Sequence, residues 1–388
     1  MSKLDELIQK VNKDFKAEIA QKGVKRKIVP KIPFSSTRAN YMTYGGIPMV
    51  GAVEFFGEPN GGKTTSALDV VSNAQMQFRE DFEEKLAELS EQLEKEKKEN
   101  NKKKIQAKIA EHNDTGHRKV LYVDTEMTLD TDWAYKLGVD LDDLILIVPE
   151  NQTAEQILQM ILEFIETGEV GLAILDSIPC LVPQQIFEES LEKKSYGGIS
   201  GPLTNFSARV SPLLKKHECV FIGINQERED LGSMYSNYTT PGGKGWKHAC
   251  SLRIRFRKGA LLDKNNKELT SKAENPAGNI VEMQIIKTKV CKPDRRMGRY
   301  TLSYTFGIDV QYDLITTMID FGLITGKGWY TFVDDEGNEL LDGDDKIRKY
   351  NGRNAICNMW DEEPEFYAEC YEKVLEKLKE VEDNGKDK

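Results

Sequence analysis

The sequence predicts an α/β protein with a mostly parallel, twisted β-sheet flanked by helices. A helix and linker precede this core and a small α+β domain follows it. Two observations support this fold class. Short runs that are apolar throughout, such as "KVLYVD" and "GLAILD", alternate with helical patterns such as "AEQILQMILEFIETG". Strands of this kind are typical of parallel sheets, whose two faces are both covered. In addition, "GAVEFF" leads directly into a glycine-rich loop and then a helical pattern.

The first segment, residues 1–48, is predicted to be an oligomerisation helix and a linker. Its apolar positions follow helical spacing, Ser2 and Asp5 form a capping box, and Gly23 is a plausible stop. The basic stretch "VKRKIVPKIPFSS" then reads as an extended linker. The segment lacks the apolar region of a signal peptide, so we expect a cytoplasmic protein.

The core is predicted to span residues 49–307 and to carry an unusual charged insertion at 79–117. Within it, Phe82, Leu86, Leu89 and Leu93 keep a 4-3-4 spacing. We expect Asn100 and Asn101 to turn the chain and Ile105 and Ile109 to bring it back as a second helix. A solvated, partly disordered insertion is the alternative, because the stretch is so highly charged.

The later part of the core continues with "CVFIGIN", "SLRIRF", "NIVEMQIIK" and "RYTLSYTF", which all read as strands. From residue 308 to 388 the composition changes to a smaller α+β domain. It has a hairpin at "GWYTFVDDEGNELL" and a terminal helix at "EEPEFYAECYEKVLEKLKEVE".

Composition excludes several classes of function. No apolar run is long enough to cross a bilayer, so we expect no membrane association. The six cysteines form no CxxC pair and the four histidines show no metal-ligand spacing, which argues against a zinc site. A net charge of -10 argues against a basic coat over the whole surface, so any DNA binding must be local.

The stretch "GEPNGGKTT" has the spacing of a phosphate-binding loop, with Gly57, four residues, then Gly62, Lys63 and Thr64. Backbone N–H groups and the start of the next helix favour bound phosphate. Lys63 would pair with β- and γ-phosphate oxygens, and Thr64 would offer its hydroxyl to Mg²⁺. The predicted nucleotide-binding residues are Gly57, Glu58, Pro59, Asn60, Gly61, Gly62, Lys63, Thr64 and Thr65.

Three further strand ends carry polar side chains. Asp176 ends "GLAILD", where a second Mg²⁺ partner is needed. Glu126 lies just beyond "YVD" and could polarise the attacking water, but the spacing does not separate it from Asp124. Gln226 follows "FIGIN", where an amide could sense the γ-phosphate.

The loop after Gln226 has tyrosines, "PGGKG", Lys244 and Lys247, and no apolar periodicity. A long glycine-containing loop of this kind is typical of a mobile functional element. Aromatic and basic residues suit single-stranded nucleic acid, and an ordinary surface loop is the alternative.

Taken in order, these stretches resemble the RecA family of homologous recombinases. The motifs that carry the resemblance are "GEPNGGKTT", "VDTEMTLDTDWAYKLGVD", "AILDSIPCLVP", "FIGINQ", "GSMYSNYTTPGGKGWKHACSLRIR" and "IIKTKVCKP". "FGIDVQYDLITTMIDFGLI" and "GWYTF" are similar to the start of the bacterial RecA C-terminal domain. The likeness extends from about Phe34 onward.

The resemblance implies roles for individual residues. It makes Glu126 the water-activating glutamate and Trp133 the aromatic that stacks on adenine, and it makes Gln226 the γ-phosphate sensor. Lys287 and Lys289 match a pair that reaches a neighbouring subunit's ATP. Residues 187–198 and 227–243 match two DNA-binding loops. The implied DNA contacts are Arg209, Tyr235, Gly242, Gly243, Lys244 and Lys247.

The chain also departs from the family's pattern. Glu58-Pro59 stands where bacterial RecA has Pro-Glu, and Gly61 stands where it has Ser. Gly201 and Pro202 interrupt the expected helix after the first DNA loop, and the insertion is extra. The C-terminus "VEDNGKDK" is not a strongly acidic tail. Such divergence around a complete site favours a phage or other mobile element as the source.

The sequence hypothesis is therefore a DNA-dependent ATPase with ATP and Mg²⁺ as cofactors. It would form a helical homo-oligomeric filament on single-stranded DNA and promote pairing and strand exchange with double-stranded DNA, with a loading or mediator protein as a further partner. One alternative is a hexameric DNA helicase on the same core, for which Arg295, Arg296 and Arg299 are candidate arginine fingers. Another is a paralogue that regulates a partner and turns over ATP poorly.

Overall fold

The computed structural model divides into two compact units, Met1–Pro30 and Lys31–Lys388. The structure describes residues 2–14, 29–188, 198–229 and 238–384. The first unit contains helix α1 (Lys3–Asp14). The predicted capping box at its start is confirmed: Ser2 N donates to Asp5 Oδ2 at 3.1 Å and Asp5 N donates to Ser2 Oγ at 3.2 Å. Gly23, the predicted stop, lies outside the described residues.

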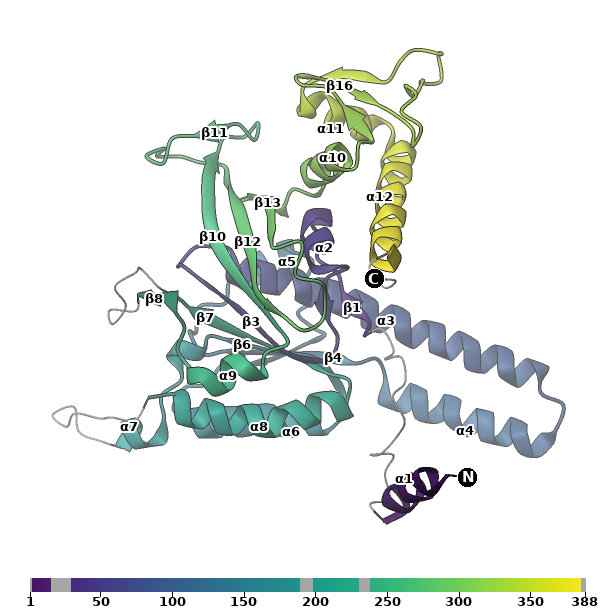
Figure 1. Ribbon diagram of the computed structural model, residues 1–388, viewed down its shortest axis with the longest axis vertical. Helices are drawn as coiled ribbons and strands as arrows, with labels where there is room; N and C mark the ends of the chain where they lie inside the picture. Colours follow the sequence, from purple (N-terminus) through teal and green to yellow (C-terminus); the bar gives the residue numbers. More distant parts are fainter. Residues whose placement is uncertain (1, 15–28, 189–197, 230–237, 385–388) are drawn as a thin grey trace. The chain divides into compact units, whose positions relative to one another are not determined.

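A ten-stranded sheet forms the centre of the second unit and confirms the predicted α/β fold (Figure 1). Its order is β14-β13-β12-β10-β3-β7-β6-β4-β5, with β11 paired to β10. From β10 to β5 all neighbours are parallel, whereas β10, β12, β13 and β14 are antiparallel. The strands are β3 (Gly51–Gly57), β4 (Lys119–Asp124), β5 (Leu144–Ile147), β6 (Val170–Asp176), β7 (Val220–Gln226), β10 (Leu252–Leu262), β11 (Glu268–Leu269), β12 (Gly278–Thr288), β13 (Met297–Ser303) and β14 (Gly307–Ile308).

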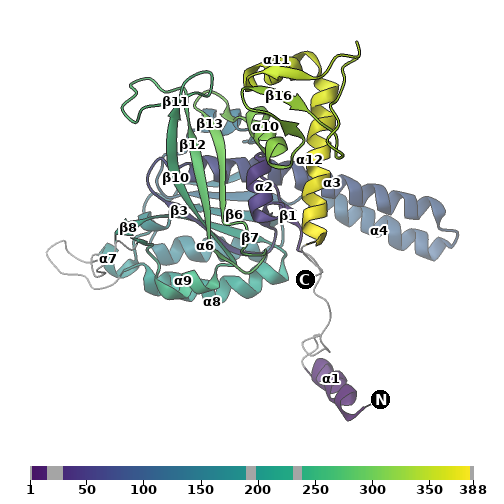
Figure 2. The same cartoon turned by 45° about the horizontal axis from the view of Figure 1, so that its top comes forward.

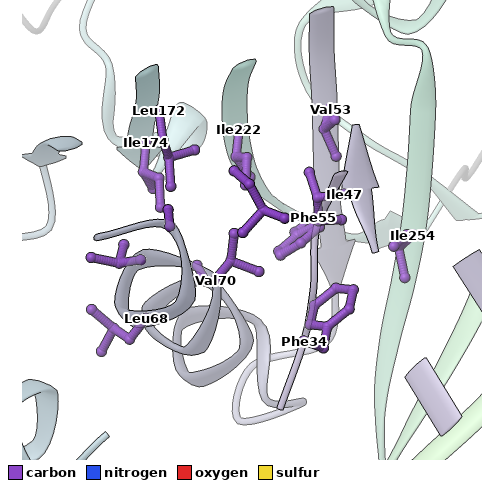
Figure 3. Packing of buried hydrophobic residues seen from close by; sticks show 14 of the residues in the cluster. Phe34, Ile47, Val53, Phe55, Leu68, Val70, Leu172, Ile174, Ile222 and Ile254 are labelled. Atoms are coloured by element: carbon purple, nitrogen blue, oxygen red, sulfur yellow. The ribbon is translucent and has the colours of Figure 1, made fainter. Parts of the chain in front are cut away.

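Helices cover both faces of the parallel half because its strands are apolar on both sides. In β6, Leu172 and Ile174 belong to the cluster that contains α3 (Lys63–Lys95), as Figure 3 shows. Their neighbours Ala173 and Leu175 belong to the cluster on the opposite face, with α6 (Ala154–Glu166), α8 (Ser200–Lys216) and α9 (Gly243–Ala249). Burying each large aliphatic side chain contributes about 1.5–3 kcal/mol. The parallel strands are thereby held between two apolar layers.

The expected break at Gly201 and Pro202 does not occur. Helix α8 begins at Ser200, so Pro202 lies in its first turn, where a missing N–H removes no intrahelical hydrogen bond. Among the described helices, none combines the length and apolar character needed to cross a membrane.

Residues 79–117 contain the outer part of α3 and all of α4 (Glu99–Thr115), and both views show the two helices leaving the core together (Figures 1 and 2). The predicted turn at Asn100–Asn101 is wrong, because both residues lie in the first turn of α4. The chain turns earlier, where Glu96 Oε1 accepts hydrogen bonds from the N–H groups of Lys97 and Lys98 at 2.9 and 2.8 Å. A carboxylate that satisfies free backbone donors favours this tight connection.

The C-terminal part has its own apolar core, built around Leu314, Phe332, Ile356, Trp360 and Val374. Its elements are α10 (Val310–Asp320), β15 (Ile324–Thr325), β16 (Trp329–Phe332), β17 (Lys349–Asn351), α11 (Arg353–Glu362) and α12 (Pro364–Asn384). The remaining elements are β1 (Lys31–Ile32), α2 (Thr37–Thr43), β2 (Ile47–Pro48), α5 (Thr131–Lys136), the 3-10 helix Ile178–Cys180, α7 (Gln184–Glu188), β8 (Arg228–Glu229) and β9 (Tyr238–Thr239).

A buried carboxylate joins α10 to the start of α2. Asp313 Oδ2 accepts hydrogen bonds from Ser36 Oγ and Thr37 Oγ1, both at 3.0 Å, and from Arg38 N at 3.2 Å. Asp313 Oδ1 is buried without a hydrogen-bond partner. Burial raises the pKa of Asp313 to about 6, against an ordinary value of 3.8, because the charged form is poorly solvated there.

We therefore expect Asp313→Asn to stabilise the protein at pH 7.5 by about 1–3 kcal/mol. The amide keeps an acceptor for the three donors and removes the buried charge. Between about pH 4 and 6, Asp313 of the wild type holds a proton in the folded state that it has lost in the unfolded state. The free energy of unfolding of the wild type therefore falls as pH rises through that window. Urea unfolding of wild type and Asp313→Asn at pH 4.5, 6 and 7.5 measures the difference in their free energy of unfolding across this window. A variant that is less stable than wild type at pH 7.5 would contradict the prediction.

Candidate nucleotide and DNA site

Four parallel strands end at one edge of the sheet, and a cavity of about 610 Å³ lies there. Parallel strands present their carboxyl ends together, which is where α/β sheets bind ligands. The cavity is lined by Pro59, Asn60, Gly61, Gly62, Lys63, Thr64, Thr65, Glu126, Trp133, Asp176, Ser177, Ile224, Gln226, Lys258, Asn279, Leu302 and Tyr304. The structure thus brings most of the nucleotide residues expected from the sequence to one place, whereas Gly57 and Glu58 do not line the cavity.

The loop between β3 and α3 is shaped for an anion. Gly57 has φ 148°, and a Cβ there would lie 2.0 Å from the carbonyl oxygen of Phe256, so only glycine fits. Helix α3 begins at Lys63, and its N-terminus therefore faces the cavity with free N–H groups. Lys63 Nζ donates to Glu58 O at 2.6 Å. Burial lowers the pKa of Lys63, although Asp176 and Glu126 oppose that shift.

Thr64 and Asp176 meet directly, with Thr64 Oγ1 donating to Asp176 Oδ2 at 2.9 Å. The Tyr122 hydroxyl donates to the same oxygen at 2.8 Å. Burial raises the pKa of Asp176 to about 6, and these two hydrogen bonds oppose the shift. Hard oxygen donors beside a phosphate loop suit Mg²⁺, which keeps several waters and needs only one or two protein oxygens. The residues present therefore fit the metal expected from the sequence.

Glu126 and Asp124 are both near β4, and their surroundings differ. Glu126 lines the cavity, and its Oε1 accepts a hydrogen bond from Ser177 Oγ at 2.5 Å. Asp124 is not part of the lining, and its Oδ2 accepts from Leu129 N at 2.9 Å. Asp124 is thus used to hold the loop after β4. Glu126 is the carboxylate that reaches the ligand space.

Trp133, on α5, lines the cavity, as expected for a residue that meets the base. Sequence reasoning missed six lining residues: Ser177, Ile224, Lys258, Asn279, Leu302 and Tyr304. Four of these come from the antiparallel strands or the turn after them, which carry no nucleotide motif. Only the position of Ser177 directly after Asp176 could have signalled its place.

Gln226 lines this cavity, and the next residue, Glu227, lines a second one. Glu227 N donates to Gly57 O at 3.2 Å, which ties the end of β7 to the phosphate loop. The Glu227 carboxylate pairs with Arg255, with Arg255 Nη2 donating to Oε2 at 2.8 Å. Arg255 also lies over the Tyr238 ring, 4.7 Å from its centroid. The two ends of the loop after Gln226 are therefore joined through one arginine.

The second cavity, of about 380 Å³, is basic. Its lining residues are Phe56, Glu227, Tyr238, Thr239, Thr240, Lys247, Arg253, Arg255, Arg257 and Ile286. Sequence reasoning missed the three arginines. The alternation in "LRIRFR" was the available signal, because residues i, i+2 and i+4 of a strand share one face.

The other DNA-contact residues expected from the sequence are partly described. Arg209 on α8 and Lys244 on α9 are exposed. Gly242 precedes α9 with φ 103°, and a Cβ there would lie 2.4 Å from Leu203 Cδ2, so glycine lets α9 pack on α8. Gly243 follows it at the start of α9, and Lys247 Nζ donates to Thr239 Oγ1 at 2.8 Å. Tyr235, residues 189–197 of the first predicted DNA loop and residues 230–237 of the second lie outside the described residues.

Lys287 and Lys289 do not line the nucleotide cavity of their own chain. They lie at the end of β12 against the carboxyl end of α9, where Lys287 Nζ donates to Lys247 O at 2.5 Å and Lys289 Nζ donates to His248 O at 2.8 Å. Burial lowers the pKa of Lys287, and Lys289 adds to that shift. The pair is thus held together on a separate surface.

A family model described as RecA N-terminal domain matches residues 98–309, more than half of the chain. The chain belongs to the RecA family. Protein RecA of Thermotoga neapolitana is 28% identical over 382 residues, covering 97% of this chain and 93% of that protein. Protein RecA of Streptomyces ambofaciens is 27% identical over 380 residues, covering 97% and 86%.

These matches also bear on the motifs found in the sequence. The chain is a RecA-family recombinase, as the sequence motifs indicated. The matched range begins at residue 98, inside the hairpin, so the loop Gly57–Thr65 lies before it. The alignments with the two RecA proteins omit only about 3% of the chain and therefore include that loop.

Proposed function

We propose that this RecA-family protein is a DNA-dependent ATPase that forms a helical filament on single-stranded DNA and promotes homologous pairing and strand exchange. The observation that carries the proposal is the single cavity that joins the phosphate loop, Glu126, Asp176 and Gln226. Gln226 lines the same cavity as the phosphate loop, and the residue after it, Glu227, lines the basic cavity. That arrangement supports an ATPase whose state is communicated to DNA.

In this proposal each cavity residue has a separate task. Lys63 and the N–H groups at the start of α3 bind the phosphates. Glu126, held by Ser177 Oγ, orients and polarises the attacking water. Thr64 and Asp176 would hold Mg²⁺, which supplies charge neutralisation on the phosphates when it is bound. Trp133 packs against the base.

Coupling to DNA is proposed to run through the end of β7. Gln226 faces the cavity, and Glu227 is bonded to Gly57 on one side and to Arg255 on the other. A shift of Gln226 on binding γ-phosphate would therefore be felt at Arg255 and Tyr238, which lie on the basic cavity. Arg209, Tyr235, Gly242, Gly243, Lys244 and Lys247 are the proposed contacts to the single strand.

Lys287 and Lys289 are proposed to act on a neighbouring subunit's nucleotide. They are absent from their own cavity, and two cations beside a γ-phosphate stabilise the charge that develops during transfer. Hydrolysis would then require an assembled filament, generated by head-to-tail contacts. Residues 1–48 are proposed to serve that contact, 49–307 the ATPase core and 308–388 a separate small domain. A cytoplasmic location and a mediator protein complete the proposal.

The test is ATP turnover with and without single-stranded DNA, together with electron microscopy of the same samples. We expect turnover to rise at least about tenfold with single-stranded DNA, because the interfacial lysines complete the site only on assembly. Filaments should appear under the same conditions. Unstimulated turnover without filaments would contradict the proposal, whereas closed rings that unwind a fork would favour the helicase alternative.

A further inference from the structure

The hairpin formed by α3 and α4 has its charges separated along its length. Residues 79–94 carry seven acidic and two basic side chains, a net charge of -5. Residues 95–108, which form the far end, carry seven lysines and two glutamates, a net charge of +5. We call this segment, Lys95–Lys108, the lysine tip. In a chain of net charge -10, it is a local cationic surface at the end of an arm.

Most of the lysines in the tip are free to meet a partner. Lys95 pairs with Glu91, and Lys102 Nζ lies 3.8 Å from Glu99 Oε1. Within the described part of the chain, the other five are exposed and form no ion pair: Lys97, Lys98, Lys103, Lys104 and Lys108. Five cations held together on a surface repel one another and gain from an external anion.

The two helices of the arm are fixed to each other. Phe82 stacks on His112 with ring centroids 4.2 Å apart, and His112 Nε2 lies 2.9 Å from Phe82 O. Leu89 is buried between the helices, with 6% exposed. These contacts give the arm an apolar seam in spite of its charge.

The base of the arm is also tied to the core. Arg79 pairs with Asp140 and Asp143, and His117 Nε2 lies 2.7 Å from Asp143 Oδ2. From Arg79 to Lys95 the helix rises about 24 Å. The lysine tip is therefore held at a distance from the nucleotide cavity, which none of its residues line.

The chemistry of the tip favours phosphate over other partners. It contains no aromatic residue, so it offers no platform on which unpaired bases could stack. Lysine ammonium groups act as point charges that suit phosphate. Duplex DNA presents one negative phosphate charge per about 1.7 Å of its axis, a higher density than an extended acidic peptide offers at about 3.3–3.6 Å per residue. Lys104 and Lys108 are one helical turn apart and can follow a single backbone.

We propose that the lysine tip binds the phosphate backbone of double-stranded DNA and brings the duplex to a filament assembled on a single strand. This assignment rests on the proposed function, which requires both DNA forms. Binding is independent of base sequence, and it adds a duplex contact outside the basic cavity beside Gln226.

The test uses the full chain in three forms. The first is wild type. The second carries Lys97→Gln, Lys98→Gln, Lys103→Gln, Lys104→Gln and Lys108→Gln, and the third carries arginine at the same five positions. Each is assembled on unlabelled single-stranded DNA with a slowly hydrolysed ATP analogue and titrated with a fluorescent mixed-sequence duplex at several salt concentrations. Single-strand-stimulated ATP turnover is measured on the same preparations.

We expect the glutamine variant to bind duplex at least about tenfold more weakly, with the slope of log affinity against log salt reduced by about 3 for three lost phosphate contacts. The arginine variant should bind as wild type does, and turnover should be unchanged in both. Equal duplex affinity of the glutamine and arginine variants would overturn the assignment, as would a loss of single-strand-stimulated turnover in the glutamine variant as large as its loss of duplex affinity. A wild type without single-strand stimulation would instead overturn the proposed function.

Discussion

Glu126→Gln should lower ATP turnover in the presence of single-stranded DNA by about 10²–10⁴-fold, the usual contribution of a positioned general base. The amide is nearly isosteric and can still accept the hydrogen bond from Ser177 Oγ, but it cannot accept a proton from water. Nucleotide binding should be retained, because the phosphate loop and Asp176 are unchanged. Steady-state turnover and equilibrium binding of a fluorescent ATP analogue measure the two quantities separately.

Asp124→Asn is the matched control for this substitution. Asp124 is the neighbouring buried carboxylate, and it accepts from Leu129 N rather than facing the cavity. An asparagine oxygen can accept the same hydrogen bond, so turnover should stay within about threefold of wild type. If Asp124→Asn abolished turnover and Glu126→Gln did not, the assignment of the two carboxylates would be reversed.

Lys287→Ala combined with Lys289→Ala should lower DNA-stimulated turnover by about 10³-fold, as removal of a charge-stabilising group supplied by a neighbouring subunit does. The unassembled subunit should bind ATP with unchanged affinity, because neither lysine lines its own cavity. Lys264→Ala with Lys272→Ala is the control, since both lysines are exposed on the β10–β12 connection and removal of two charges there should leave turnover unchanged.

Mixing two inactive variants decides whether these lysines act between subunits. The Glu126→Gln subunit supplies intact lysines, and the double lysine variant supplies an intact cavity. An equal mixture should recover about a quarter of wild-type turnover, because about one interface in four joins the two intact halves. No recovery, with filaments still formed, would indicate that the lysines act within one subunit.

Much of the lining of the first cavity could be predicted because its signals are local. The spacing in "GEPNGGKTT" fixes a strand, a loop and a helix start together, since each glycine meets a backbone constraint. The polar residues at the ends of β6 and β7 were found by the same reasoning, because apolar runs define where a buried strand stops.

The remaining features depend on contacts between distant residues. Thr64 and Asp176 are 112 residues apart, and their direct hydrogen bond follows from strand order alone. Arg255 was missed because a charged residue in a strand signals an exposed face, whereas here it is held by Glu227. The hairpin turn was misplaced because asparagine propensity gave way to the Glu96 carboxylate, which accepts from two backbone donors. For Arg255 and the hairpin turn, a specific acceptor overrides what the local sequence favours.

Helix α3 is continuous over its 33 residues, from Lys63 at the phosphate loop to Lys95 at the far end of the hairpin. Its axis is about 48 Å long. By the length of this axis alone, a tilt of about 5° at the Lys63 end corresponds to a displacement of about 4 Å at the Lys95 end. The phosphate loop and the lysine tip are therefore joined by one unbroken helix, so a change of tilt at Lys63 would displace Lys95 more than any α3 residue between them.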